Sequence, residues 1–469
     1  AMRQSYWWVV AALATMATMT TGDRPGWYDE ETFAVYDSFL RRKLEPYKEH
    51  GLGADAVKLA MRLGACKDTC DPNEARWNTH FQIVNGTVYA VGGIQPFWNE
   101  HHRKRVKAVY TIFAELVKLQ PDLPDVEFVI NFHDYNKVLR SQEDTMSWGD
   151  STYCPPFALN ESFLESARSG ASRSCEAVGG SAGSFKEHEP QFHGHDWQLH
   201  YRIYGNHFGN PIIRVNETNP LKIAIFSATS CAFSYDISFP TTFYDFDLLD
   251  QEYSELFQTT EALFPWDSKL DVAFFRGSCW FYKSHGRTAA MTMSKVAKDL
   301  VDAEWYDEIR TDMLEKDGIP QFGDIHESAR YKYLLHLEGH DFWSMRIRSL
   351  AHIRSLLLMQ QLPCEEFYYG FFKPYTHYLP IKRDLSDLFE AVLWARQNDD
   401  VVLNISDSLV NTARRVLNKK SVLQYVHMAI VRYSKLLRYQ VKLHPKARPI
   451  DPQNRSLQQH LCAFQFRPS

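Results

Sequence analysis

The segment from Asp271 to Arg287 (DVAFFRGSCWFYKSHGR) constrains the fold more than any other part of the chain. Its apolar run from Val272 to Phe275 is typical of a buried β-strand, and the run stops abruptly at Arg276. From Asp271 onward, strands alternate with helices, and this pattern predicts a parallel sheet and an α/β fold. Ligands of open α/β sheets bind at the carboxyl ends of the strands. The Arg-Gly-Ser sequence that follows this strand would offer a guanidinium, a backbone N–H and a hydroxyl there.

A second segment, Tyr331 to Leu350 (YKYLLHLEGHDFWSMRIRSL), has the pattern of a strand, a glycine turn and a helix. We expect the buried strand to end before Gly339, and we expect Ser344 to cap a helix that runs to about Gln360. The N–H groups and the dipole of a helix N-terminus favour an anion such as phosphate. The same pattern also fits an ordinary strand–helix unit whose arginines face water.

Length and charge limit the class of protein. The chain has 469 residues, which is too many for one compact core and predicts two domains. Its formal net charge is −5 and it has no long basic run, so we do not expect nucleic acid as a partner. The short basic stretch from His101 to Arg105 is expected to form the solvated face of a helix.

The N-terminal region, the cysteines and the glycosylation motifs indicate the secretory pathway. An apolar run from Tyr6 to Ala14 lies within residues 1–22, which we interpret as a signal peptide or the remnant of a signal anchor. The eight cysteines suit an oxidising lumen, although their spacing does not define the disulfide pairs. We therefore expect the lumen of the endoplasmic reticulum or Golgi, with membrane contact only through a type II anchor. N-glycosylation acceptor motifs begin at Asn85, Asn160, Asn216, Asn404 and Asn454.

Three further blocks accompany these two segments, namely DVEFVINFHDYN (Asp125–Asn136), FSATSCAFSYDISFP (Phe226–Pro240) and EFYYGFFKPYTHYLPIKRDLSDL (Glu366–Leu388). Together the blocks resemble the Rumi-type protein O-glucosyltransferase family, which also includes fungal capsule-associated xylosyltransferases. They occur in the family's order between roughly residues 121 and 400. The resemblance implies the GT-B fold, in which two Rossmann-like domains face each other across a cleft.

This fold would divide the chain after the signal region into two domains and a tail. Residues 23–255 would form the acceptor-side α/β domain, which carries a Ser/Gly-rich insertion at about 144–196. Residues 256–420 would form the Rossmann-like domain that binds the nucleotide sugar. Residues 421–469 would form a C-terminal helix and tail.

Asp134 is the candidate catalytic base. It follows the apolar run Val126–Phe132, so it is expected just beyond a strand end, where partial burial makes a carboxylate more basic. From the residues alone, such an aspartate more often caps a helix or turns the chain, and it is the resemblance that implies the role of base. The family typically reads Arg-Asp-Tyr-Pro where this chain has His133-Asp134-Tyr135-Asn136. The carboxylate is therefore kept, while the loop around it differs.

The resemblance also implies a donor site at the two opening segments. Arg348 stands where the family usually has a lysine, which keeps the charge but not the geometry. The residues that match the diphosphate-binding loop and the helix start are Arg276, Ser278, Arg287, Gly339, Ser344, Arg346 and Arg348.

The implied reaction is the inverting transfer of glucose or xylose from a UDP-sugar to a hydroxyl group. The acceptor would be a Ser or Thr of a protein domain, or a glycan. Such a transfer needs a base for the acceptor proton and positive charge or N–H donors for the leaving diphosphate, and we expect no metal. The sugar side of the cleft is expected to be lined by Asp236, Phe239 and Pro240.

Two other functions stay open at this point. Asp245 and Asp247 resemble the carboxylate pair that holds Mn²⁺ in metal-dependent transferases, although a lone Asp-x-Asp is common by chance. The bulky Trp280 and Phe342 near the donor segments also fit an inactive relative that binds a sugar or a protein.

Overall fold

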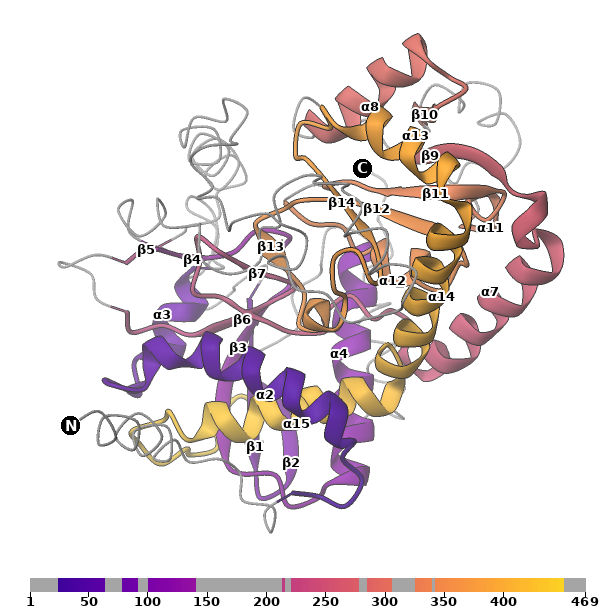
Figure 1. Cartoon of the computed structure of the whole chain (residues 1–469). Helices are drawn as coiled ribbons and strands as arrows, with labels where there is room; N and C mark the ends of the chain where they lie inside the picture. Colours follow the sequence, from indigo (N-terminus) through magenta and orange to yellow (C-terminus); the bar gives the residue numbers. More distant parts are fainter. Residues whose placement is uncertain are drawn as a thin grey trace, which may run out of the picture.

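Two β-sheets and the helices around them make up the computed structural model of the chain (Figure 1). The structure describes residues 24–63, 78–91, 100–140, 213–215, 221–277, 285–305, 325–339 and 342–450. The first sheet is built from the N-terminal half together with a strand near the C-terminus, and the second from residues 270–381. The predicted α/β fold with two Rossmann-like domains is confirmed. The signal region and the Ser/Gly-rich insertion lie outside the described residues.

The first sheet is mixed, with the strand order β15 (Ala447–Pro449), β2 (Thr87–Val91), β1 (Asn78–Val84), β3 (Val126–Asn131), β6 (Ile225–Ser227) and β8 (Ile237–Ser238). β1 pairs antiparallel with β2 and with β3, whereas β6 and β8 continue the sheet in parallel. The hairpin between β1 and β2 turns at Asn85 and Gly86, whose φ angles are 50° and 70°. Two-residue hairpin turns require positive φ, which is why an Asn-Gly pair stands here.

Helices cover both faces of the first sheet because its strands alternate their side chains between two cores. Phe128 of β3 packs against Phe81 of β1 and Phe226 of β6, with ring centres 5.9 and 5.6 Å apart. This core also takes side chains from α2 (Glu30–Leu44) and α4 (Glu100–Leu119). The neighbouring Val129 faces the other way, into the cluster beneath α3 (Ala56–Arg62).

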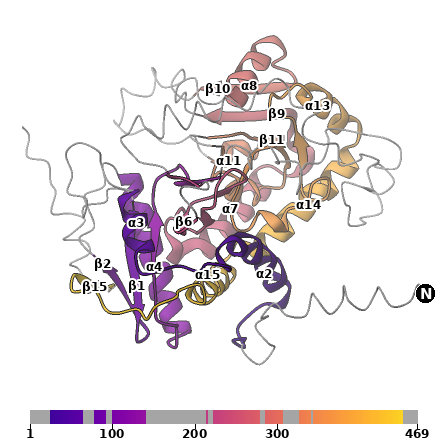
Figure 2. The same ribbon diagram turned by 90° about the vertical axis from the view of Figure 1, so that its left-hand side faces the viewer.

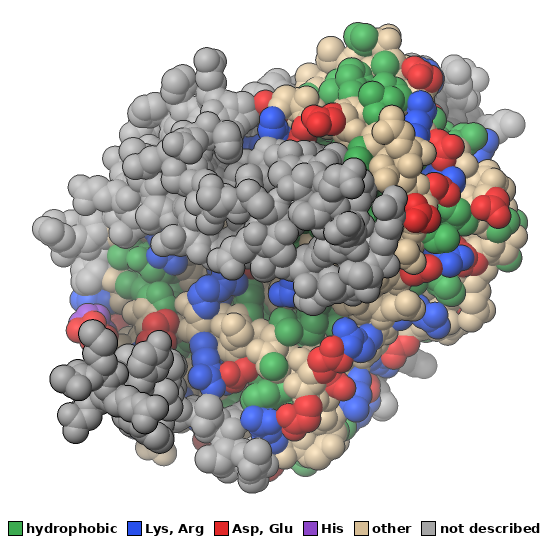
Figure 3. All heavy atoms as spheres, viewed as in Figure 1, with side chains coloured by type: hydrophobic (Ala, Val, Ile, Leu, Met, Phe, Trp, Pro, Cys, Tyr) green, Lys and Arg blue, Asp and Glu red, His purple; other side chains and the backbone are tan. Residues whose placement is uncertain are grey.

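The second sheet is parallel throughout, with the order β10 (Val301–Trp305), β9 (Leu270–Gly277), β11 (Tyr331–His336), β12 (Leu356–Gln360) and β14 (Leu379–Ile381). β10 and β11 lie on opposite sides of β9, so the strand order reverses between β9 and β11. A crevice forms at such a switch point, outside the carboxyl ends of the strands. The accompanying helices are α7 (Leu249–Leu263), α8 (His285–Val296), α11 (Ile325–Ser328), α13 (Leu388–Gln397) and α14 (Asp399–Val416). Around α7 and α14, Figure 3 shows acidic and basic side chains interspersed on this face.

The helix predicted from Ser344 to about Gln360 is much shorter in the structure. α12 spans only Ile347–Leu350, and the chain then forms β12 between β11 and β14. Leu356, Leu357 and Leu358 are buried there. A fully buried parallel strand is apolar on both faces, so its sequence does not show the alternation that would distinguish it from a helix.

The C-terminal helix returns the chain to the first sheet. α15 (Lys419–Ser434) crosses from the end of α14 and lies beside α2 and α4 (Figures 1 and 2). Buried hydrogen bonds fix its position: the Tyr36 hydroxyl lies 2.7 Å from that of Ser421, and the Tyr425 hydroxyl donates to the Ser238 carbonyl at 2.5 Å. The C-terminal segment is therefore packed into the domain that the N-terminal half begins.

A disulfide joins the two halves of the chain. Cys231 lies in β7 (Ser230–Cys231) and Cys364 in β13 (Cys364–Glu365), and these short strands pair antiparallel. Cys364 follows β12 of the second sheet, whereas Cys231 follows β6 of the first.

The remaining elements are β4 (Val138–Leu139) paired with β5 (Ile213–Arg214), and the 3₁₀ turns η2 (Glu45–Tyr47), η6 (Phe246–Leu248), η7 (Trp266–Ser268) and η8 (Tyr369–Phe371).

Candidate active site

A cavity of about 510 Å³ lies at the carboxyl ends of β9 and β11 and extends to the end of β3 in the first sheet. This is the switch point of the second sheet, where an α/β fold places its ligand. Six of its charged side chains were singled out from the sequence, and the structure brings them into this one cavity. They are Asp134, Asp245, Arg276, Arg287, Arg346 and Arg348.

Asp134 forms the first-sheet side of the cavity, in the loop after β3. One of its carboxylate oxygens accepts a hydrogen bond at 2.5 Å from Arg105 of α4, and the Asp134 side chain keeps 20% of its exposure. Arg105 is only 2% exposed. The prediction that the basic stretch ending at Arg105 is a solvated face is therefore wrong for this residue. Val109, Ile112 and Leu116 follow it at helical spacing and are buried, and this register could have placed Arg105 inside.

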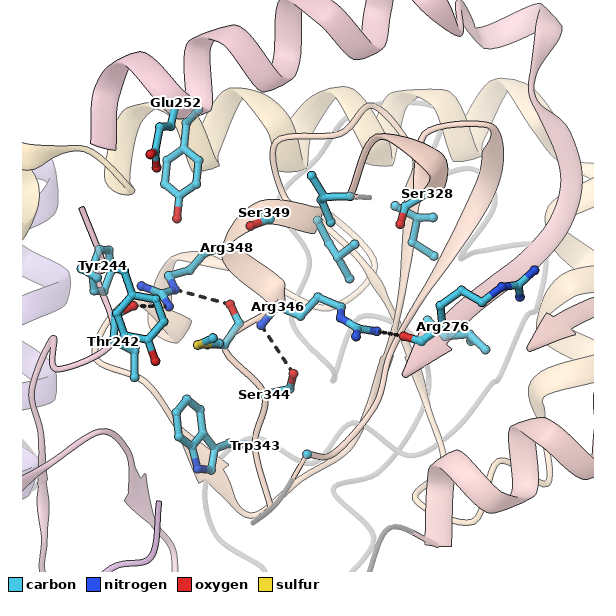
Figure 4. A pocket seen from close by; sticks show the side chains of 18 of the residues that line it. Thr242, Tyr244, Glu252, Arg276, Ser328, Trp343, Ser344, Arg346, Arg348 and Ser349 are labelled. Carbon is cyan, nitrogen blue, oxygen red and sulfur yellow. Dashed lines mark hydrogen bonds between the residues drawn. The ribbon is translucent and has the colours of Figure 1, made fainter. Parts of the chain in front are cut away.

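Two further residues of the site were not found from the sequence. The indole N–H of Trp343 donates to the Asp134 carbonyl at 3.3 Å, so a residue of the second half touches the candidate base. The Tyr244 hydroxyl accepts a hydrogen bond from Arg105 at 3.4 Å. Both side chains line the cavity (Figure 4). Trp343 lies in the second donor segment, where the bulk of Phe342 and Trp343 was the only signal, and Tyr244 stands in no motif with a known role.

Arg287 and Arg346 converge at the floor of the cavity. Their guanidinium carbons lie 5.5 and 4.9 Å from the centre of the same Phe275 ring. The Arg287 Nε donates to the Glu338 carbonyl at 2.7 Å, and Arg346 donates to the Arg276 carbonyl at 2.5 Å. Burial and these two positive charges lower the pKa of the nearby His336 to about 3, so that histidine is neutral. The two arginines thus place fixed positive charge in this part of the cavity, and a bound diphosphate would bring the complementary negative charge.

The turn between β11 and α12 brings backbone close to these arginines. The Gly339 N–H donates to the Trp343 carbonyl at 2.8 Å. A Cβ atom at Gly339 would lie 2.7 Å from that carbonyl oxygen, so a side chain there would force the turn open. The Ser344 hydroxyl accepts from the Arg346 N–H at 3.4 Å and faces the cavity (Figure 4). Ser344 was predicted to cap a long helix. In the structure the helix that follows, α12, has a single turn, and the Ser344 hydroxyl contacts the N–H of Arg346 just before it.

Two of the predicted donor-site arginines are held by protein groups. Arg276 binds Asp302 through both terminal nitrogens, at 3.0 and 3.2 Å, and its side chain points away from Trp343 (Figure 4). Arg348 is buried, donates to the Thr242 carbonyl at 2.8 Å and lies over the Phe243 ring. Both residues line the cavity, and the contacts just named hold their side chains in place. Ser278 lies outside the described residues.

Asp236, Phe239 and Pro240 are not among the residues that line this cavity, and their place on the sugar side of the cleft stays a prediction. All three are buried. The Asp236 carboxylate accepts hydrogen bonds from the backbone N–H groups of Lys137 and Val138 and so closes the loop that follows Asp134. Burial raises the pKa of Asp236 to about 6. An aspartate that satisfies loop N–H groups and one that contacts a sugar give the same sequence pattern.

The Asp245 and Asp247 pair lies beside the cavity in a strained turn. Asp245 has a φ of 48°, lines the cavity and lies 3.6 Å from the Lys107 ammonium. Within the described part of the chain, no group of three or more His, Cys, Asp or Glu side chains is arranged to hold a metal ion.

The described residues include two of the five glycosylation motifs. Asn85 is exposed at the hairpin turn, and Asn404 is exposed on α14. The hydroxyl of Ser406 in the second motif is buried and donates to the Val402 carbonyl, so an enzyme could reach that motif only in the unfolded chain. Asn160, Asn216 and Asn454 lie outside the described residues.

None of the helices in the described ranges is long and apolar enough to cross a membrane.

Two sheets that carry Rossmann-like units, with an arginine-rich cavity at a strand-order switch, define a two-domain α/β protein whose cavity suits an anionic ligand. The chain belongs to glycosyl transferase family 90, whose model matches residues 210–464. The family predicted from the sequence blocks is thereby confirmed.

Curated relatives agree with the family and match about half of each protein. The chain is 32% identical over 183 residues to protein O-glucosyltransferase 1 of Homo sapiens, a match that covers 38% of this chain and 46% of that protein. It is 29% identical over 248 residues to protein O-glucosyltransferase 3 of Mus musculus, which covers 51% of this chain and 45% of that protein. The chain thus spans somewhat less than half the length of these relatives.

Proposed function

We propose that this protein transfers glucose or xylose from a UDP-sugar to a hydroxyl group, either a Ser or Thr of a protein domain or a glycan, with inversion at the sugar. The observation that carries the proposal is the single cavity in which a carboxylate from the first domain, Asp134, faces a set of arginines from the second. The membership of family 90 and the similarity to protein O-glucosyltransferases support glycosyl transfer to proteins.

The second domain is suited to hold the donor. Arg287 and Arg346 offer forked, permanently charged groups for phosphate oxygens, and the glycine at position 339 lets the backbone come close. Positive charge fixed at the leaving diphosphate stabilises the transition state more than the substrate, because the diphosphate gains charge as the bond to the sugar breaks. The arginines can supply this charge from protein groups, so we propose that no metal cofactor is required.

The first domain is suited to activate the acceptor. In the proposed step the acceptor hydroxyl oxygen attacks the anomeric carbon while the bond from that carbon to the diphosphate breaks. The hydroxyl proton passes to the Asp134 carboxylate, and the free UDP leaves with the electron pair of the broken bond. Because attack and departure take place on opposite faces of the sugar, the configuration at this carbon is inverted.

Replacing Arg287 or Arg346 with alanine is expected to weaken UDP binding by about 1.5–3 kcal/mol each, since each change removes charge-assisted hydrogen bonds. Isothermal calorimetry with UDP measures the change. Arg330→Ala is a matched control, because Arg330 is an exposed arginine of the same domain that does not line the cavity. Unchanged affinity in both cavity variants would remove these arginines from the donor site.

We propose that the protein acts in the lumen of the endoplasmic reticulum or Golgi. The Cys231–Cys364 disulfide supports this, because such bonds persist in oxidising compartments. Protein from its native host should therefore move faster on a gel after endoglycosidase treatment, with Asn85 among the occupied sites. A protein without glycans and with eight reactive thiols would contradict the lumenal location.

A further inference from the structure

Arg105 is a buried charge at the centre of three different segments. From α4, its side chain donates to the Phe132 carbonyl at 2.9 Å, to the Asp134 carboxylate at 2.5 Å and to the Tyr244 hydroxyl at 3.4 Å. Phe132 follows β3, and Tyr244 belongs to the loop that follows β8. Burial alone would lower the pKa of Arg105, but the Asp134 carboxylate and Tyr244 outweigh this effect and raise it. The guanidinium is therefore charged whenever the protein is folded.

Burying a guanidinium is unfavourable unless its hydrogen bonds and its charge are satisfied. A leucine at this position would pack into the same face of α4 without that cost, so packing does not account for an arginine here. What the arginine adds is a planar fork, which binds a carbonyl at the end of β3 and a carboxylate two residues further along the chain. The direction of the Asp134 carboxylate is thereby tied to the strand.

We propose that Arg105 is the positioning residue for Asp134, an inference that rests on the proposed role of Asp134 as base. It holds one carboxylate oxygen so that the other is directed at the acceptor hydroxyl, and it keeps the carboxylate ionised in a partly buried place. A neighbouring cation makes a carboxylate a weaker base. The same cation fixes the direction of the Asp134 carboxylate and keeps it ionised at mildly acidic pH.

Other charged and titratable groups near this pair are Tyr244, Arg348 and Glu366. Tyr244 and Glu366 both interact electrostatically with Arg105, and Arg348 interacts with Tyr244. Burial raises the pKa of Tyr244, and burial also raises that of Glu366. Tyr244 therefore stays neutral up to a higher pH than an ordinary tyrosine and does not shape the acidic limb of a pH–rate profile. Glu366 is buried, accepts a hydrogen bond from the Tyr368 hydroxyl and is not among the residues that line the cavity.

The test compares Arg105→Lys and Arg105→Met in a UDP-release assay across pH, with UDP affinity measured by calorimetry. We expect both changes to lower kcat on the order of 10²-fold and to leave UDP affinity within about twofold of wild type, because they misdirect the base without touching the donor site. We expect only Arg105→Met to move the acidic limb of the profile up, by about 1–3 pH units, because a carboxylate without its cation holds its proton more tightly. Lysine keeps the charge and loses the fork.

Arg432→Gln provides a control, since Arg432 pairs with the carboxylate of Asp37 in a partly buried place outside the cavity. It is expected to lower the melting temperature without moving the pH profile. Wild-type kcat and an unmoved acidic limb in folded Arg105→Met would overturn the inference. If that variant does not fold, wild-type kcat in Arg105→Lys would overturn it. Full turnover in Asp134→Asn would instead remove Asp134 as the base, and no turnover by the wild type would contradict the proposed function, so these failures are distinct.

Discussion

Asp134→Asn is expected to lower glycosyl transfer by about 10²–10⁴-fold, the usual cost of losing a general base, while UDP binding stays nearly unchanged. Asparagine has the same shape as aspartate and can still accept a hydrogen bond from Arg105, so the cavity should keep its form. It cannot take the proton of the acceptor hydroxyl. Turnover of a UDP-sugar with and without acceptor, together with calorimetry for UDP, measures the two parts of this prediction.

The matched control is Asp245→Asn, a second carboxylate at the same cavity. It is expected to leave turnover within a few-fold of wild type, since the Asp245 carboxylate pairs with Lys107, whereas Asp134 pairs with Arg105. Near-normal turnover in Asp134→Asn would remove this residue from the mechanism. A loss in Asp245→Asn as large as that in Asp134→Asn would favour the metal-dependent alternative.

Replacing both Cys231 and Cys364 with alanine is expected to lower the free energy of unfolding by about 2–5 kcal/mol. The disulfide spans 133 residues of sequence, so it closes a long loop and restricts the unfolded chain strongly. In the folded state it joins β7 to β13 and hence the two domains to each other. Chemical denaturation of wild type and variant, each with and without a reductant, measures the loss.

The reductant provides the internal control for this prediction. It should destabilise the wild type and leave the double variant where it was. Equal stability of the two proteins under oxidising conditions would mean that the bond does not contribute to holding the domains together.

The sequence was sufficient for features that depend on local pattern. The parallel second sheet was predicted from alternating strand and helix signals, and it is present. Asp134 and Arg287 follow strands of different sheets, β3 and β9, so only the family resemblance, with its two domains facing across a cleft, could bring them to one site.

Features that depend on what surrounds a residue could not be predicted. Arg105 looked like one of several exposed basic residues, and only its partners in two other segments make it part of the site. Asp236 accepts hydrogen bonds from loop N–H groups, and its sequence pattern did not distinguish this role from contact with a sugar. The apolar run at Leu356–Gln360 fits a buried helix and a central strand equally well. It forms a strand because it pairs with β11 on one side and β14 on the other.

The central claim is that the cavity binds a UDP-sugar and turns it over with protein groups alone. The most direct test measures UDP release from UDP-glucose and from UDP-xylose by the purified protein, with and without EDTA. We predict release from at least one donor at a rate that EDTA does not change and that Asp134→Asn abolishes. Release that EDTA abolishes and Mn²⁺ restores would contradict the metal-free account, and no release from either donor would contradict the proposed activity itself.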